Sequence, residues 1–204
     1  MLSFTGFNEQ SMVSLIKEAK QNESVAFAFG RFNPPTSGHE KLVNLVLSTA
    51  AKKHADALIF TSKTQEPAKN PLEFKDKIKY LKKLFPKVNV IDDPKMVNIF
   101  VVLKMLSEAG YKDVSLIAGG DRTDKFDSEV RKYIKHNDPK KSLDFDAFKV
   151  YNAGERANEI SASEMRAYAK QNDFESFSKG LPSTANKSIA QSLFKDVRTG
   201  MKLS

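Results

Sequence analysis

"FGRFNPPTSGHEKL", residues 29–42, connects two segments that differ in their pattern of apolar residues. Before it, Val25–Phe29 is a nearly continuous apolar run, typical of a strand that is covered on both faces. After it, residues 38–53 repeat apolar side chains at the spacing of a helix. Two prolines within the stretch prevent the helix from beginning before Thr36 or Ser37. We therefore expect a strand, a stiff turn and a helix at the start of the fold.

The same alternation continues along the chain. Further short β-rich runs are found at Ala57–Thr61, Val88–Ile91, Val114–Ala118 and Ala147–Tyr151. Helical patterns are found at 71–84, 96–109, 126–136, 161–170 and 186–197, with an additional N-terminal helix at 9–22. Strands that alternate with helices form right-handed crossovers and a parallel sheet. The sequence therefore predicts an α/β class, Rossmann-like open parallel sheet with helices on both faces and helical additions at both ends.

The chain length fits one domain. A chain of 204 residues can be built around a single hydrophobic core, and no internal repeat or low-complexity tract divides it. We expect residues 1–204 to form one domain whose core is about 25–170. Residues 1–23 would add the N-terminal helix, and residues 171–204 would form a C-terminal helical extension.

Composition narrows the classes of function. The chain has no cysteine, which excludes disulfides, thiolate zinc sites and a cysteine nucleophile. No apolar run approaches the roughly 18–20 residues of a membrane helix, and the N-terminus lacks a signal-peptide pattern, so we expect a soluble cytoplasmic protein. The net charge of +8 favours polyanionic partners such as nucleic acid, phospholipid or nucleoside triphosphates.

The opening stretch has the features of an anion site. Ligands of open α/β sheets bind outside the carboxyl ends of the strands, which is where this stretch begins. Gly30 has no Cβ, so a ligand can approach the backbone closely. Ser37 and Glu40 have the spacing of a capping box, which predicts the helix start. Thr36 and His39 then lie beside unpaired backbone N–H groups at the positive end of the helix dipole.

A second segment, "ISASEMR" at residues 160–166, repeats this pattern. Ser161 and Glu164 again have capping-box spacing, so we expect a helix to start at Ala162. Ser163 offers a hydroxyl in the first turn, and Arg166 offers a guanidinium fork one turn later. Taken alone, the segment is more typical of a well-capped surface helix. Together with the first stretch, it favours a phosphate site.

Both segments carry a family resemblance. "GRFNPPTSGH", residues 30–39, resembles the (His/Thr)-x-Gly-His signature of the nucleotidyltransferase (cytidylyltransferase-like) α/β-phosphodiesterase superfamily. "ISASEMR" resembles its Ile-Ser-x-Thr-x-x-Arg motif, with Ser163 in place of threonine, and "IAGGDR", residues 117–122, resembles a segment that ends the fourth strand. The resemblance spans about residues 25–170. It is closest to nicotinamide-mononucleotide adenylyltransferases, and the chain as a whole also resembles phage-encoded members, for which the host cytoplasm is the expected location.

This resemblance implies a reaction and a set of roles. A phosphate oxygen of an acceptor attacks the α-phosphorus of a nucleoside triphosphate, expected to be ATP carrying Mg²⁺, and pyrophosphate leaves. By resemblance the catalytic residues are His39, which stabilises the α-phosphate, Thr36, which replaces the first histidine of the motif, and Arg166. The other residues expected to contact nucleotide are Gly30, Arg31, Phe32, Gly38, Lys63, Gly119, Asp121, Arg122, Ile160, Ser161 and Ser163. We expect no metal ligands from the protein.

Several of these residues keep two interpretations. Arg31 can bind phosphate or pair with a carboxylate. Lys63 can neutralise phosphate or face solvent, and Asp121 can contact a ribose or acceptor or be a turn residue after two glycines. A group of lysines in and just after the segment 71–84 can attract triphosphates, but the sequence favours a solvated helix face for them; they are residues 75, 77, 79, 82, 83 and 87.

The function also keeps alternatives. The favoured acceptor is nicotinamide mononucleotide, although the chain has no tryptophan to stack on the nicotinamide ring. One alternative is a cytidylyltransferase or another adenylyltransferase of the same fold. Another is a protein that binds nucleotide or nucleic acid without catalysis, although aromatic RNA-binding signatures are absent, so nucleic acid is not expected as a partner. Small-molecule nucleotides are the expected partners, with no membrane association and with homo-oligomerisation open.

Overall fold

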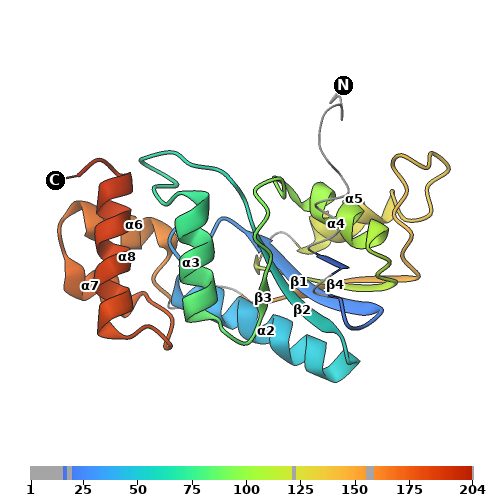
Figure 1. The fold of residues 1–204 in the computed structure, drawn as a ribbon, viewed down its shortest axis with the longest axis horizontal. Coiled ribbons are helices and arrows are strands. Elements are labelled where there is room, and N and C mark those ends of the chain that lie inside the picture. Colours follow the sequence, from blue (N-terminus) through green and yellow to red (C-terminus); the bar gives the residue numbers. More distant parts are fainter. Residues whose placement is uncertain (1–15, 18–19, 121–122, 155–158, 204) are drawn as a thin grey trace.

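The structure is a computed structural model, and it describes residues 16–17, 20–120, 123–154 and 159–203. Five strands form one parallel sheet in the order β3-β2-β1-β4-β5 (Figure 1). Their bounds are Ser24–Gly30 for β1, Asp56–Thr61 for β2, Asn89–Val90 for β3, Asp113–Ala118 for β4 and Ala147–Asn152 for β5. The predicted Rossmann-like α/β class is confirmed.

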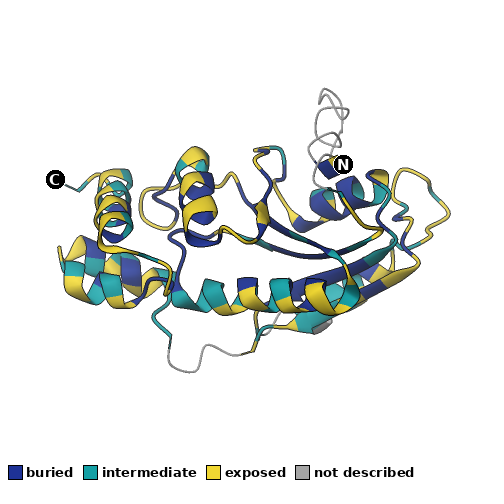
Figure 2. Ribbon diagram, turned by 60° about the horizontal axis from the view of Figure 1, so that its bottom comes forward, coloured by how far each residue is buried: buried dark blue, intermediate teal, exposed yellow. Residues whose placement is uncertain are grey.

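Helices cover both faces of the sheet. Their bounds are Ser37–Lys53 for α2, Phe74–Leu84 for α3, Ile99–Glu108 for α4, Thr123–Arg131 for α5, Ala162–Lys170 for α6, Phe174–Lys179 for α7 and Lys187–Gly200 for α8. Side chains alternate along β1, so Ala26 and Ala28 pack with α2, α3 and the C-terminal helices, while Val25 and Phe27 pack with α4 and α5. The two packed layers bury the strands between them (Figure 2).

The first motif, within residues 29–42, follows β1, which is the central strand of the sheet. β1 pairs with β2 on one side and with β4 on the other, so the chain leaves β1 at the point where the strand order reverses. Gly30 lies opposite Thr61 at the carboxyl ends of β1 and β2. This switch point is the usual ligand position in open α/β sheets.

The start of α3 and the end of α5 differ from the predicted boundaries, because groups distant in sequence form hydrogen bonds with the residues there. The segment expected at 71–84 becomes helical only at Phe74, because the buried amide of Asn33 donates to the Leu72 carbonyl (3.0 Å) and accepts from the Leu72 N–H (2.9 Å). The segment expected at 126–136 ends at Arg131, because the next residues form backbone bonds with Leu143. Neither pairing is visible in local periodicity.

Other boundaries differ less. The helix expected at 96–109 begins at Ile99 behind the Asn98 cap, and the third strand has two residues instead of four. The helix expected at 186–197 continues to Gly200, and α7 was not expected. The helix expected at 9–22 lies largely outside the described residues, although Ile16 is fully buried against the α4 side of the sheet.

The C-terminal extension packs onto the body of the domain. Helices α6, α7 and α8 gather at one end of the molecule beside α3 (Figure 1). The Tyr80 hydroxyl of α3 donates to Asp196 (2.5 Å), the Thr184 hydroxyl donates to the Leu84 carbonyl (2.7 Å), and Arg198 donates to the Ala169 carbonyl (2.7 Å). Buried residues of the extension join the same apolar cluster as α2 and α3.

A glycine at the end of α8 provides a test of this packing. A Cβ at Gly200 would overlap the backbone carbonyl oxygen of Pro71, which precedes α3. Backbone cannot move aside as a flexible side chain can, so Gly200→Ala should lower the free energy of unfolding by about 1–3 kcal/mol. Urea denaturation measures this, with Lys195→Ala on the exposed face of α8 as control. Equal stability of the two variants would show that the extension is not held against Pro71.

Among the described residues, no helix combines the length and the apolar character that crossing a membrane requires.

Candidate functional site

The N-terminus of α2 is closed by the first motif itself. Thr36 is the N-cap residue, and its hydroxyl accepts from the backbone N–H of His39 (3.3 Å). In return, Nδ1 of His39 accepts from the backbone N–H of Thr36 (3.0 Å). These reciprocal bonds form the capping box, so the predicted box between Ser37 and Glu40 is wrong.

Ser37 and Glu40 are instead bound by the C-terminal extension. The Ser37 N–H donates to the carbonyl of Gly180 (2.9 Å). The Glu40 carboxylate accepts from the backbone N–H of Ser183 (2.9 Å) and from the Ser183 hydroxyl. A partner so distant in sequence competes successfully with the local cap, and it ties the extension to the first turn of α2.

This capping geometry fixes the proton of the His39 ring. Because Nδ1 accepts a backbone N–H, the hydrogen-bond network assigns the proton of the neutral imidazole to Nε2. The ring of the buried Phe32 lies against the imidazole, with centroids 4.7 Å apart and planes at 44°. His39 is therefore held as an Nε2–H donor at the start of a helix.

Phe32 also explains the glycine at the end of β1. A Cβ at Gly30 would lie 2.9 Å from the Phe32 ring, and Phe32 itself has a left-handed backbone (φ 47°). We expected Gly30 to leave room for a ligand, but in the structure the nearest occupant of that space is Phe32. Phe32 contacts His39 through its buried ring, which gives it a packing role in the site.

Glu159 fills the space beside Gly38. A Cβ at Gly38 would lie 2.7 Å from a Glu159 carboxylate oxygen, and the same carboxylate forms an ion pair with Lys41 of α2. Only 12% of the Glu159 side chain is exposed. A carboxylate is stabilised by the positive end of a helix dipole, so its presence here is consistent with an anion-binding turn. Glu159 was not among the residues expected at the site, because it lies just outside the second motif, residues 160–166.

The second motif caps α6 as expected. The Ser161 hydroxyl accepts from the backbone N–H of Glu164 (3.1 Å), and the Glu164 carboxylate accepts from the backbone N–H of Ser161 (2.8 Å). Ile160 lies against Gly180, where a Cβ would meet Ile160 and Met165 at 2.9 Å. The Ser161–Glu164 capping box is confirmed, and Gly180 contacts both motif segments.

Arg166 joins the two motifs directly. One guanidinium nitrogen donates to the carbonyl of Asn33 (2.8 Å), although the residues are 133 positions apart, and the other donates to the exposed Ser163 hydroxyl (2.9 Å). Burial lowers the pKa of Arg166, and the positive charge of Arg31 lowers it further. Two like charges close together favour an anion between or beside them. The structure therefore brings Arg31, Ser163 and Arg166 to the start of the first motif.

Lys63 and Lys77 have different environments. Lys63 is exposed directly after β2, and the preceding Ser62 N–H donates to the Gly30 carbonyl (3.0 Å). Lys77 of α3 is fully buried, so its assignment to a solvated lysine face is wrong. Its ammonium donates to the backbone carbonyls of Ser62 and Thr64. The other five lysines of that set are exposed as predicted: Lys75, Lys79, Lys82, Lys83 and Lys87.

The end of β4 is described in part. Asp121 and Arg122 lie outside the described residues, so their assignments stay predictions. A Cβ at Gly119 or Gly120 would meet nothing within 4 Å, and Gly120 has φ +43°. Within the described part of the chain, no three histidine or acidic side chains are placed to hold a metal ion.

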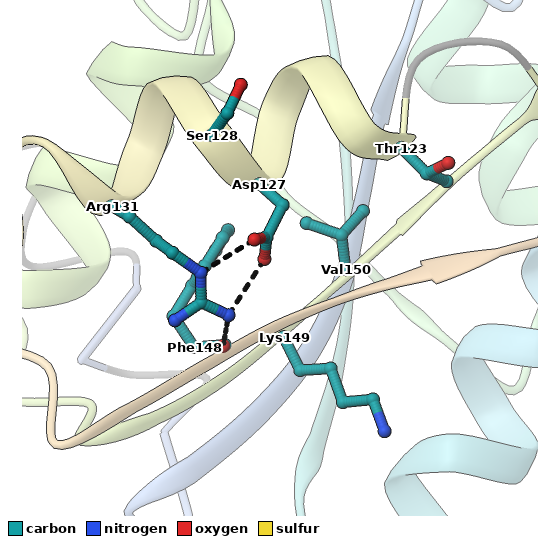
Figure 3. Close-up of a pocket in the computed structure, with 7 residues that line it drawn as sticks. All are labelled: Thr123, Asp127, Ser128, Arg131, Phe148, Lys149 and Val150. Atoms are coloured by element: carbon teal, nitrogen blue, oxygen red, sulfur yellow. Dashed lines mark hydrogen bonds and ion pairs between the residues drawn. The ribbon is translucent and has the colours of Figure 1, made fainter.

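A hollow of about 440 Å³ lies between α5 and β5 (Figure 3), and none of its lining residues belongs to either motif. Its arginine is already engaged, because Arg131 forms a fork with both carboxylate oxygens of Asp127 (2.6 and 2.9 Å) and donates to the Phe148 carbonyl (3.3 Å). Lys149 points away from α5 in this view. The hollow therefore offers little to an anionic ligand.

Comparison with known families gives one assignment. The sequence model described as "Cytidylyltransferase-like" matches residues 27–168, which contain both motifs and all five strands except the start of β1. Comparison with curated proteins gives no significant match.

Proposed function

Because the chain belongs to the cytidylyltransferase-like family of nucleotidyltransferases, we propose that it is an adenylyltransferase that forms NAD. In this reaction, a phosphate oxygen of nicotinamide mononucleotide forms a bond to the α-phosphorus of ATP. The bond between the α-phosphorus and the bridging oxygen breaks, and pyrophosphate leaves with the electron pair. The acceptor phosphate is anionic at neutral pH, so the protein needs no general base.

One observation carries the proposal. The hydrogen bond from Arg166 to the Asn33 carbonyl joins the two motif segments, which supports the proposal that their candidate anion-binding groups act on one ligand. The candidate ligand-binding groups of the two segments are donors and cations, namely the Nε2–H of His39, the Ser163 hydroxyl and the guanidinium of Arg166, while the Glu159 carboxylate beside Gly38 is paired with Lys41. Such a set suits a polyphosphate, whose transfer depends mainly on positioning and charge stabilisation.

The proposed roles follow from this placement. His39 donates its Nε2–H to an α-phosphate oxygen and stabilises the charge that develops there. Thr36 fixes the His39 ring through the capping box. Ser163 and Arg166 hold the β- and γ-phosphates, with Arg31 nearby. These groups orient the leaving pyrophosphate.

Mg²⁺ would be carried by the triphosphate. The described residues include no cluster of three acids or histidines, and the polar groups at the site are mostly cations and hydrogen-bond donors. Magnesium commonly keeps its waters and binds substrate phosphates, and there it would neutralise part of the phosphate charge.

A pyrophosphate-release screen tests the donor and the acceptor. The purified chain is incubated with Mg²⁺, each of the four nucleoside triphosphates and a panel of phosphorylated acceptors. We expect ATP with nicotinamide mononucleotide to release pyrophosphate fastest and to form NAD, which a coupled dehydrogenase detects.

The other outcomes separate the alternatives. A preference for CTP, or for a different phosphorylated acceptor with ATP, would overturn the substrate assignment and keep nucleotidyl transfer. Absence of triphosphate binding would overturn the catalytic proposal in favour of a protein that binds another nucleotide or nucleic acid.

A further inference from the structure

Lys77 is a buried cation that the reaction described above does not use. It lies in α3 with no exposed surface, and its ammonium donates to the carbonyl of Ser62 and, at 3.5 Å, to that of Thr64. Its helical neighbours Ile78 and Leu81 are buried in the apolar core. A fully buried lysine side chain is unusual at a position packed into an apolar core.

Burying this charge is unfavourable. Burial lowers the pKa of Lys77 to about 8, and no opposite charge among the described residues counteracts that effect. An ammonium removed from water without a carboxylate costs free energy, whereas methionine fits such a position without that cost. The compensation visible in the structure is the pair of bonds to the Ser62 and Thr64 carbonyls.

Those two carbonyls belong to the loop that leaves β2. The loop is bound to the first motif, because the Ser62 N–H donates to the Gly30 carbonyl (3.0 Å). The Ser62 hydroxyl is buried and has no hydrogen-bond partner within the described part of the chain. Between the two carbonyls, Lys63 projects from the loop as an exposed residue. The buried cation thus holds the backbone on both sides of an exposed one.

We propose that Lys77 is a positioning residue that holds the loop 62–64 so that Lys63 meets a phosphate of the bound triphosphate. This inference rests on the proposed function. Lys77 does not touch the ligand, and it acts by fixing the backbone from which Lys63 extends. If the loop is already ordered before phosphate binds, binding does not have to overcome the entropy cost of ordering it.

The first experiment needs no ligand. Amide hydrogen exchange is measured in peptides covering residues 62–66 for wild type, Lys77→Met and the matched control Lys75→Met, whose lysine is exposed on the same helix. Protection should fall about tenfold in Lys77→Met, especially at the Ser62 and Glu66 amides, which are bonded to Gly30 and Asn70. Lys75→Met should match wild type. If Lys77→Met does not fold, Lys77→Gln keeps an N–H donor without the charge and should give a smaller fall.

The second experiment is a double-mutant cycle on ATP binding with Lys63→Ala and Lys77→Met. Each single variant should weaken ATP binding by about five- to tenfold. The double variant should be no weaker than the poorer single variant, because Lys77 acts through Lys63. A merely structural role for Lys77 would leave the effect of Lys63→Ala unchanged in the Lys77→Met background.

The two experiments distinguish failure of the inference from failure of the proposed function. Unchanged amide exchange at residues 62–66 in Lys77→Met, or additive effects on ATP binding in the double-mutant cycle, would overturn the positioning role of Lys77. If the wild-type chain binds ATP in the same experiments, the proposed function is not affected by that result. Absence of ATP binding by the wild-type chain would overturn the proposed function and, with it, the role of Lys77.

Discussion

Replacing His39 with alanine is expected to lower turnover by about 10²–10³-fold, the usual effect of removing one donor that stabilises developing charge. The reason is the orientation of its ring. Nδ1 accepts from the Thr36 N–H, so the ring proton is on Nε2, the nitrogen that we propose donates to the α-phosphate. Steady-state kinetics with ATP and nicotinamide mononucleotide measures the effect. The KM for either substrate should change much less than kcat.

His39→Gln separates catalysis from helix capping. Glutamine at this third helical position can accept from the backbone N–H of the cap residue, so it retains the capping box and removes the imidazole. We expect His39→Gln to melt near the wild-type temperature and, because its amide N–H can still donate, to lose less turnover than His39→Ala. His136→Ala, at an exposed histidine far along the chain, should leave turnover unchanged. Near-normal turnover in folded His39→Ala would remove His39 from the chemistry.

The fold could be predicted from the sequence because its determinants are local. Burial can be predicted directly from the apolar runs of β1 and β4 and from the helical periodicity of α2. The alternation of strands with helices then predicts a parallel sheet. Element ends were less predictable. The start of α3 depends on the side chain of Asn33, which no window around Phe74 contains.

The first capping box shows how a correct spacing can predict the wrong partner. Ser37 with Glu40 and Thr36 with His39 offer the same three-residue separation, so the sequence alone cannot choose between them. The choice is made by the distant Ser183, which takes the Glu40 carboxylate. The consequence for function is considerable, because the observed box orients the histidine.

The burial of Lys77 could have been predicted from its position in the helix, but the many lysines around it point to a solvated face. Six lysines within one short segment suggest a solvated face, but position 77 lies three residues after Phe74 and four before Leu81, on the apolar stripe of α3. A charged residue on such a stripe is the informative exception in a lysine-rich helix. Its carbonyl partners belong to the loop after β2, so only the tertiary structure could supply its role.

Arg166→Lys is expected to raise the KM for ATP by about tenfold to a hundredfold, the equivalent of roughly 1.4–2.8 kcal/mol, with a smaller change for the acceptor. Arg166 uses separate guanidinium nitrogens for the Asn33 carbonyl and the Ser163 hydroxyl, so it bridges the motifs and aligns its remaining N–H groups. Lysine retains the charge but is a single point donor that cannot reproduce this planar fork.

A matched arginine outside the site provides the control for this last prediction. Arg131 also forms a two-nitrogen fork, on Asp127 beside the α5–β5 hollow, so Arg131→Lys loses comparable geometry without touching either motif (Figure 3). It should leave both KM values unchanged, and thermal melts of the two variants show whether either is misfolded. If Arg166→Lys bound ATP as well as Arg131→Lys does, Arg166 would be a structural link between the motifs and the β- and γ-phosphates would be held elsewhere. A selective loss of ATP affinity would place the triphosphate at the junction of the two segments, because that junction is what the fork of Arg166 builds.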